Sequence, residues 1–169
     1  MTPHLPDMDL KRCFPPVVNP QTRLLILGSL PGEASLAQQQ YYAHPQNRFW
    51  ELLGSVIGVD LRAQPYAQRL DTLLAHGVGL WDVIAQAERK GSLDAAIRNH
   101  AHNALTDLIA TLPALRAVAF NGGTSARIGR KQLQVAQGLQ LIDLPSSSPA
   151  YTLAFAQKLN VWSALAAVL

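Results

Sequence analysis

The residues best suited to chemistry lie in one short segment, residues 41–50, which reads Tyr-Tyr-Ala-His-Pro-Gln-Asn-Arg-Phe-Trp. An amide can hold a polar group, an imidazole can transfer a proton, and a guanidinium can bind an anion. Two tyrosines, a histidine, an asparagine, an arginine and two more aromatic rings within ten residues exceed what a connecting loop requires. The segment therefore indicates a functional site.

A sharp turn precedes this segment. The run 24–27, Leu-Leu-Ile-Leu, is short and continuous, as expected for a strand buried on both faces of a parallel sheet. Residues 28–32, Gly-Ser-Leu-Pro-Gly, follow it directly. Ligand clefts in open α/β sheets form beyond the carboxyl ends of such strands, because the loops diverge there and expose backbone N–H groups. By itself the turn is also compatible with an ordinary strand-to-helix connection.

Alternating strands and helices must position these residues. We expect strands at 24–27, 78–84, 116–120 and 139–144. Helical segments are expected at 33–41, 47–57, 65–75, 104–112, 124–131 and 152–168, and Asn47 can cap the second of these. The alternation predicts a three-layer α/β/α sandwich with a mainly parallel, four-stranded central sheet. Residues 85–102 are polar and ambiguous.

Residues 1–20 contain five prolines, which deny hydrogen bonds to helices and sheets, so this segment is predicted to be an irregular arm. The whole of residues 1–169 is predicted to form a single domain. Four loops should then meet at one sheet edge: residues 28–32, the chain after Asp82, residues 121–123 (Asn-Gly-Gly) and residues 145–151 (Pro-Ser-Ser-Ser-Pro-Ala-Tyr).

Composition bounds the function class. No apolar run approaches the roughly 20 residues that span a bilayer, and the N-terminus lacks a signal-peptide pattern, so we expect a cytoplasmic protein without a membrane partner. The single cysteine, Cys13, cannot form an internal disulfide, and no Cys or His cluster has metal-ligand spacing. We therefore expect no metal and no cofactor. The net charge of +3 permits contact with nucleic acid, and residues 121–169 carry four basic residues and one acidic residue, which favours a phosphate-facing edge there.

The motifs, in this order, resemble the uracil-DNA glycosylase superfamily, in which a Gly-x-x-Pro-Gly turn after the first strand faces a serine- and proline-rich loop after the last. Residues 42–50 are similar to a segment of the mismatch-specific uracil glycosylases. Over about residues 22–169, the combination most resembles the hypoxanthine-DNA glycosylase branch. The motifs that carry this resemblance are Gly-Ser-Leu-Pro-Gly at 28–32, Gln-Gln-Tyr-Tyr at 39–42, Leu-Trp-Asp-Val-Ile at 80–84, Phe-Asn-Gly at 120–122 and Ser-Ser-Ser-Pro-Ala at 146–150.

The resemblance implies the same fold and a monomeric repair enzyme acting on DNA that contains deaminated bases. It would flip the base out and hydrolyse its glycosidic bond, leaving an abasic site. The motifs include no lysine placed to form a Schiff base with the sugar, so the enzyme is expected to be monofunctional. A mismatch-specific uracil glycosylase and a non-catalytic DNA-binding relative remain alternatives. A hydrolase of small esters or phosphates is less favoured, because the chain lacks Gly-x-Ser-x-Gly, a Walker loop and a metal cluster.

The resemblance also suggests a role for each site residue. Base-binding residues would be Gly28, Ser29, Leu30, Tyr42 and Asn121. DNA-binding residues would be Ser146, Ser147, Ser148, Pro149, Ala150 and Tyr151. Tyr42 would form the aromatic floor under the base, or would be a half-buried tyrosine that packs against the first strand. Asn121 would bind the base edge or form a turn, and Tyr151 would enter the duplex as a wedge or anchor the final helix.

One departure bears on catalysis. Mismatch-specific uracil glycosylases have a water-positioning asparagine before the proline of the turn, and this chain has Leu30 there. The hypoxanthine branch also lacks that amide and offers the asparagine of the Tyr-Tyr segment instead, which is Asn47. The catalytic candidates are therefore Asn47 and Asp82. Asp82 would orient water or the catalytic amide, or would serve only as a loop carboxylate.

Overall fold

The central sheet has four parallel strands in the order β3-β2-β6-β7. They are β2 (Leu24–Gly28), β3 (Val78–Asp82), β6 (Ala117–Asn121) and β7 (Gln140–Leu144). The computed structural model describes residues 9–133 and 138–169. All residues of β2 and β6, the two inner strands, are buried, which explains their continuous apolar runs. The four strands and their mainly parallel pairing confirm the prediction.

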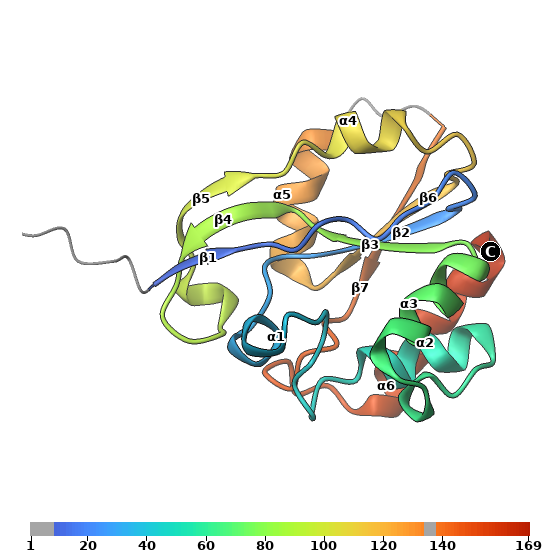
Figure 1. Ribbon diagram of the computed structural model, residues 1–169, viewed down its shortest axis with the longest axis horizontal. Coiled ribbons are helices and arrows are strands. Elements are labelled where there is room, and N and C mark those ends of the chain that lie inside the picture. Colours follow the sequence, from blue (N-terminus) through green and yellow to red (C-terminus); the bar gives the residue numbers. More distant parts are fainter. Residues whose placement is uncertain (1–8, 134–137) are drawn as a thin grey trace, which may run out of the picture.

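Helices cover both faces of this sheet (Figure 1). On one face Leu24 and Ile26 pack with a cluster that includes Trp50 and Trp162, and on the other Leu25 and Leu27 pack with a second cluster. The first face carries α2 (Phe49–Ile57), α3 (Tyr66–Ala75) and α6 (Phe155–Trp162); the second carries α4 (Leu105–Ala110) and α5 (Gly123–Leu133). Helix α1 (Glu33–Gln38) follows the turn after β2. The three-layer prediction is confirmed.

A second, antiparallel sheet corrects two expectations. Strands β1 (Leu10–Arg12), β4 (Ile84–Glu88) and β5 (Arg98–His102) form it in the order β1-β4-β5. The irregular arm predicted for residues 1–20 is corrected at Leu10–Arg12, which form a strand, whereas residues 13–20 contain no helix and only an isolated bridge at Val17; the first eight residues lie outside the described range. The ambiguous segment 85–102 contains β4, β5 and a short 3₁₀ turn, Asp94–Ala96.

The chain changes sheets at the end of β3, which shortens the strand expected at 78–84. Strand β3 ends at Asp82, and the Val83 N–H donates to the Gly28 carbonyl at 2.9 Å, so the next residues lie against the turn after β2. Ile84 already belongs to β4, which extends away from the central sheet (Figure 1). Asp82 is thus placed where the two sheets meet.

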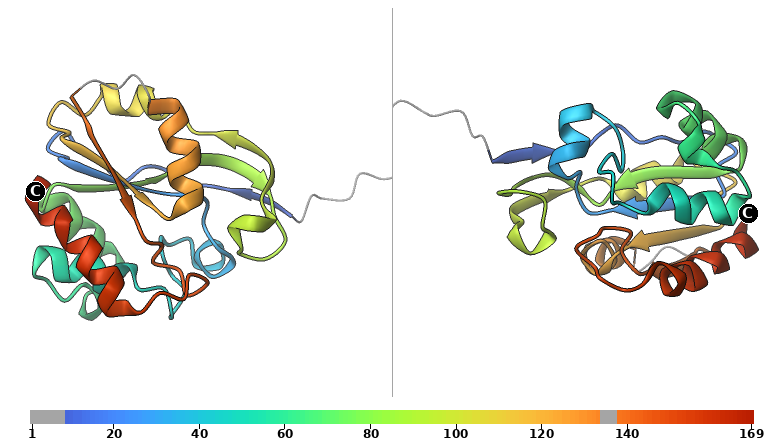
Figure 2. Two further views of the ribbon diagram at one scale, coloured as in Figure 1. Left: turned by 180° about the vertical axis from the view of Figure 1, so that it is seen from behind. Right: turned by 90° about the horizontal axis from the view of Figure 1, so that it is seen from below.

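Some helix bounds differ from expectation. Helix α2 begins at Phe49, two residues later than predicted, and the final helix is divided into α6 and a 3₁₀ turn, Ser163–Val168 (Figure 2). None of the described helices is long and apolar enough to cross a membrane.

Candidate active site at the carboxyl ends of the parallel strands

Asp82 and Tyr42 meet over Gly28. A Cβ atom at Gly28 would lie 2.6 Å from Asp82 Oδ1 and 3.0 Å from the Tyr42 hydroxyl oxygen. Only glycine allows both side chains to approach the backbone this closely. Tyr42 has a φ of 52°, a left-handed conformation that is unusual for a bulky residue and is often found at functional sites. The sequence-predicted turn and the Tyr-Tyr segment are therefore brought together at one point.

The Asp82 carboxyl group is almost fully enclosed. Its residue is 4% exposed, and its Oδ2 has no hydrogen-bond partner among the described residues. Burial, with a further contribution from the charge of Asp94, raises the pKa of Asp82 to about 7, while the positive charge of Arg89 acts in the opposite direction. Near neutral pH this group can therefore either hold or release a proton, which is a property of many catalytic carboxyl groups.

The Tyr42 ring is held by α2. It stacks on the Phe49 ring with centroids 3.9 Å apart and planes 14° apart, and the Tyr42 carbonyl accepts a hydrogen bond from Trp50 Nε1 at 3.1 Å. Its hydroxyl group is buried and lacks a partner in the described part of the chain. Burial, and next the charge of Asp82, raise the pKa of Tyr42, so the phenol stays neutral. A fixed, half-buried ring of this kind suits the floor that the sequence predicts.

Asn47 lies just before α2 and is half-buried. Its Oδ1 accepts a hydrogen bond from the Phe49 N–H at 3.0 Å, and its carbonyl accepts one from Arg62 Nη2 at 2.8 Å. Arg48 occupies the N-cap position of α2, so the cap predicted at Asn47 is displaced by one residue. The Asn47 side chain still accepts a hydrogen bond from an N–H group of the first helical turn. Its Nδ2 group makes no hydrogen bond to any described residue and remains available as a donor.

Asn121 anchors the loop 145–151. Its Nδ2 donates to Ser147 Oγ at 2.9 Å, and its Oδ1 accepts from the Ser147 N–H at 2.9 Å. Asn121 is 8% exposed, and these two bonds occupy both ends of its amide. Each bond uses one of the two Nδ2 hydrogens or one lone pair of Oδ1, so the second Nδ2 hydrogen is left over and the base-edge role of Asn121 stays a prediction. Through these two bonds Asn121 holds the loop 145–151 beside Arg48. The backbone N–H of Arg48 donates to the Ser147 carbonyl at 3.0 Å.

The end of the loop 145–151 projects outward. Pro149 and Ala150 are exposed, and Tyr151 keeps 48% of its surface accessible. The Tyr151 N–H donates to the Ser148 carbonyl at 3.1 Å, which closes a tight turn around Pro149. So exposed a ring argues against the anchor role, and the wedge role of Tyr151 stays a prediction.

The segment after β4 supplies three polar residues that sequence reasoning missed. Ser29 Oγ donates to Asp94 Oδ1 at 2.7 Å, and the Glu33 N–H donates to Ser92 Oγ at 2.8 Å, so this segment is bound to the turn 28–32. Arg89 is only 1% exposed; its Nη2 donates to the Pro31 carbonyl and its Nε to the Gly91 carbonyl at 2.8 Å.

Arg89 Nη1 is buried and has no partner among the described residues. Three of the four buried side-chain atoms without partners in the described chain, those of Tyr42, Asp82 and Arg89, thus lie on residues that contact the turn 28–32. Buried polar groups are normally paired, and exceptions often mark functional sites. No motif distinguishes Arg89 in the sequence, because it lies in a polar segment without clear periodicity.

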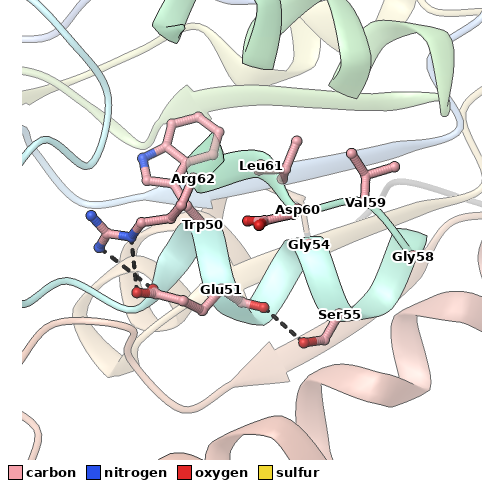
Figure 3. A pocket seen from close by; sticks show the side chains of 9 residues that line it. All are labelled: Trp50, Glu51, Gly54, Ser55, Gly58, Val59, Asp60, Leu61 and Arg62. Atoms are coloured by element: carbon pink, nitrogen blue, oxygen red, sulfur yellow. Dashed lines mark hydrogen bonds and ion pairs between the residues drawn. The ribbon is translucent and has the colours of Figure 1, made fainter. Parts of the chain in front are cut away.

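Two hollows on the surface of the described chain lie away from these residues. Figure 3 shows one beside α2 and the 3₁₀ turn Leu61–Ala63, where Arg62 Nε lies 2.8 Å from Glu51 Oε1. Another lies between β1 and α1. Neither of these two hollows is lined by a predicted site residue. In the described ranges no three His, Cys, Asp or Glu side chains gather as metal ligands would.

Comparisons with known proteins identify the family. Residues 15–168 match the family described as the uracil DNA glycosylase superfamily. Two proteins named hypoxanthine DNA glycosylase are each 40% identical: one from Methanosarcina barkeri over 90% of this chain and 96% of that protein, and one from Methanosarcina acetivorans over 83% and 88%. The solution NMR structure of a candidate uracil DNA glycosylase from Methanosarcina acetivorans superposes with a TM-score of 0.83 at 38% identity, covering 93% of this chain and 96% of that one. The chain belongs to the uracil DNA glycosylase superfamily.

Proposed function

We propose that this protein is a monofunctional DNA glycosylase that removes hypoxanthine from deoxyinosine and leaves an abasic site. The observation that carries the proposal is the 40% identity to two hypoxanthine DNA glycosylases over most of both chains. The residue choice at the turn supports it, because Leu30 stands where mismatch-specific uracil glycosylases place a water-positioning amide.

The chemistry asks little of the protein beyond positioned polar groups. Cleavage passes through an oxocarbenium-like sugar while negative charge develops on the departing base, so donors directed at the base lower the barrier. Hypoxanthine leaves as an anion more easily than an amino-bearing base. The base must first rotate out of the stack, which costs a few kcal/mol and least at a mispaired site. The Tyr42 ring, stacked on Phe49, would offset part of that cost.

In this proposal Asn47 and Asp82 are the catalytic residues. Asn47 would position the attacking water through its free amide group, because its oxygen is already bound to the Phe49 N–H. The ionised carboxylate of Asp82 would orient that water or the Asn47 amide. Its enclosure keeps the pKa near 7, so a substantial fraction is ionised at neutral pH. Ser29 and Leu30 would line the base pocket beside Gly28, and Ser146 to Ser148 would contact phosphates.

A uracil glycosylase is the second candidate, and the structural likeness to the candidate uracil DNA glycosylase favours it. The experiment that separates the two incubates the protein with duplexes carrying inosine, uracil or xanthine opposite each base, followed by alkali cleavage at abasic sites. We expect fastest cleavage at inosine. Faster cleavage at uracil would support the second candidate, and stable binding without cleavage of any lesion would indicate a non-catalytic relative.

The monofunctional part of the proposal has a separate test. Sodium borohydride should trap no covalent protein–DNA adduct, and the product strand should stay intact until alkali is added. A trapped adduct would show that a lysine forms a Schiff base. We also propose that the protein acts as a monomer in the cytoplasm, which light scattering and cell fractionation would check.

A further inference from the structure

Two exposed aromatic rings flank the entry to α6. Tyr151 is 48% exposed and Phe155, the first residue of α6, is 37% exposed. The remaining large apolar side chains that are exposed in the described chain are Leu93 and Val161. Exposed apolar residues that occur singly are common. The surroundings of Phe155 are what distinguish it.

A cation lies over each ring. The guanidinium carbon of Arg48 is 5.6 Å from the Phe155 ring centroid, and Lys158 Nζ is 5.4 Å from that of Tyr151. Both distances are within the range of cation–π attraction. Phe155 and Lys158 are three residues apart on α6 and are therefore neighbours on its surface. The four side chains form a row in the order Tyr151, Lys158, Phe155, Arg48.

Each of the two cations has a polar partner, and that of Arg48 is shared. Lys158 is 3% exposed and donates to the Ser148 carbonyl at 3.1 Å. Burial, and next the charge of Arg48, lower the pKa of Lys158. Glu51 lies 3.5 Å from Arg48 Nη1, but the same carboxylate is 2.8 Å from Arg62 Nε. Arg48, which is exposed, therefore offers positive charge beside the exposed Phe155 ring.

This row is continuous with the loop expected to contact DNA. The Arg48 N–H donates to the Ser147 carbonyl, and the loop 145–151 leads directly into α6, as the two views of Figure 2 show. Proteins that bind single-stranded DNA combine aromatic rings, on which bases stack, with cations that bind the phosphates. The exposed Phe155 ring, with Arg48 over it, combines the same two groups.

We propose that Phe155, with Arg48 across its ring, is a stacking site for an unpaired nucleotide of the DNA strand, and that the protein therefore binds single-stranded DNA. The inference rests on the proposed function only in taking DNA as the partner. The base occupies the part of the Phe155 ring that Arg48 leaves open, and the guanidinium group binds the adjoining phosphate. Stacking does not depend on base identity, so the site accepts any sequence.

The test is fluorescence anisotropy with an undamaged, labelled single-stranded thymidine 15-mer, which offers no base to excise. Loss of one stacked base weakens binding by about fivefold or more, so Phe155→Ala should raise Kd by at least that factor, and Phe155→Trp should restore binding. Val161→Ala is the matched control, because Val161 is 41% exposed on the same helix and has no cation over it. It should bind like the wild type.

Salt dependence separates the two members of the site. Arg48→Gln should reduce the slope of log K against log salt concentration by about 0.7, the value for one phosphate contact on a single strand. Phe155→Ala should lower affinity at every salt concentration with the slope unchanged, because a phenyl ring releases no counterion. If Phe155→Ala melts early, Phe155→Leu keeps an apolar side chain without the ring and should show the same loss.

The inference is overturned if Phe155→Ala binds the 15-mer as tightly as the wild type, or if Val161→Ala loses as much affinity. It is also overturned if the wild type excises a base from duplex DNA but does not bind the 15-mer, in which case the proposed function stands. Binding of the 15-mer that depends on Phe155, without excision of any lesion, supports the stacking site and refutes the glycosylase activity.

Discussion

Asn47 carries two polar groups, and single substitutions can separate their contributions. Its Oδ1 satisfies the Phe49 N–H at the start of α2, and its Nδ2 has no partner in the described chain. Asn47→Ala removes both groups. Asn47→Asp retains an oxygen that can accept from Phe49 N–H and removes only the amide donor. The pair of variants therefore distinguishes a cap from a group that acts on water or base.

The expected magnitudes follow from these contacts. Loss of a side-chain cap costs about 1 kcal/mol, which lowers Tm by roughly 2–4 °C in a domain of this size. Loss of one positioned group that acts in the transition state reduces the rate by about 10²- to 10³-fold. We expect Asn47→Ala to show both losses. Asn47→Asp should keep the wild-type Tm, or gain slightly because a negative charge is favourable at a helix N-terminus, and should still lose most activity.

The assay is single-turnover cleavage of an inosine duplex with enzyme in excess, with thermal melting of each variant measured in the same buffer. DNA affinity, measured with a non-cleavable analogue, should change far less than the cleavage rate. If folded Asn47→Ala cleaves at the wild-type rate, Asn47 is only a cap. If Asn47→Asp alone keeps full activity, the oxygen rather than the amide donor is the working group, and the proposed role of the free Nδ2 is wrong.

Three further substitutions test other parts of the site. The pKa of Asp82 is raised from 3.8 to about 7 on folding, so the folded state binds an extra proton between these pH values and the contribution of Asp82 to stability falls as pH rises from about 4 to 7. Asp82→Asn should remove this part of the pH dependence of the free energy of unfolding, measured by urea unfolding. Identical pH profiles for the wild type and the variant would contradict the burial argument. Arg89→Met leaves the Pro31 and Gly91 carbonyls without their donor and should cost about 2 kcal/mol, read as a Tm several degrees lower; an unchanged Tm would show that water replaces the guanidinium group. Tyr151→Ala should keep Tm, because the ring is 48% exposed, and should lose more activity on a well-paired lesion than on a mismatched one; equal losses would exclude the wedge.

The amino-acid sequence alone determined the sheet and where its loops meet. Residues 24–27 and 117–120 are continuous apolar runs because both faces of a central parallel strand are buried, and this pattern is local. The motifs at their carboxyl ends must converge because parallel strands end at the same edge. The family was also recognisable, since its motifs are contiguous segments with fixed spacing.

The tertiary structure decided which polar atoms meet. Asp82 and Tyr42 approach Gly28 from different elements. No local pattern predicts that Asp82 Oδ2 and the Tyr42 hydroxyl group are buried without a hydrogen-bond partner among the described residues. The cap expected at Asn47 moved by one residue because the helix bounds depend on packing of α2. The strand β1 was missed because three residues carry too little periodicity, and its pairing with β4 joins positions more than 70 residues apart.

Arg89 shows most clearly what the sequence could not reveal. Its partner Pro31 is 58 residues away, and Ser29 meets Asp94 across 65 residues. A buried arginine and an exposed one look alike in a sequence, because the difference lies in the carbonyl groups that other segments bring to it. The residue types of the turn 28–32 could therefore be recognised in the sequence, whereas the hydrogen bonds that hold the turn form only when the second sheet packs against the first.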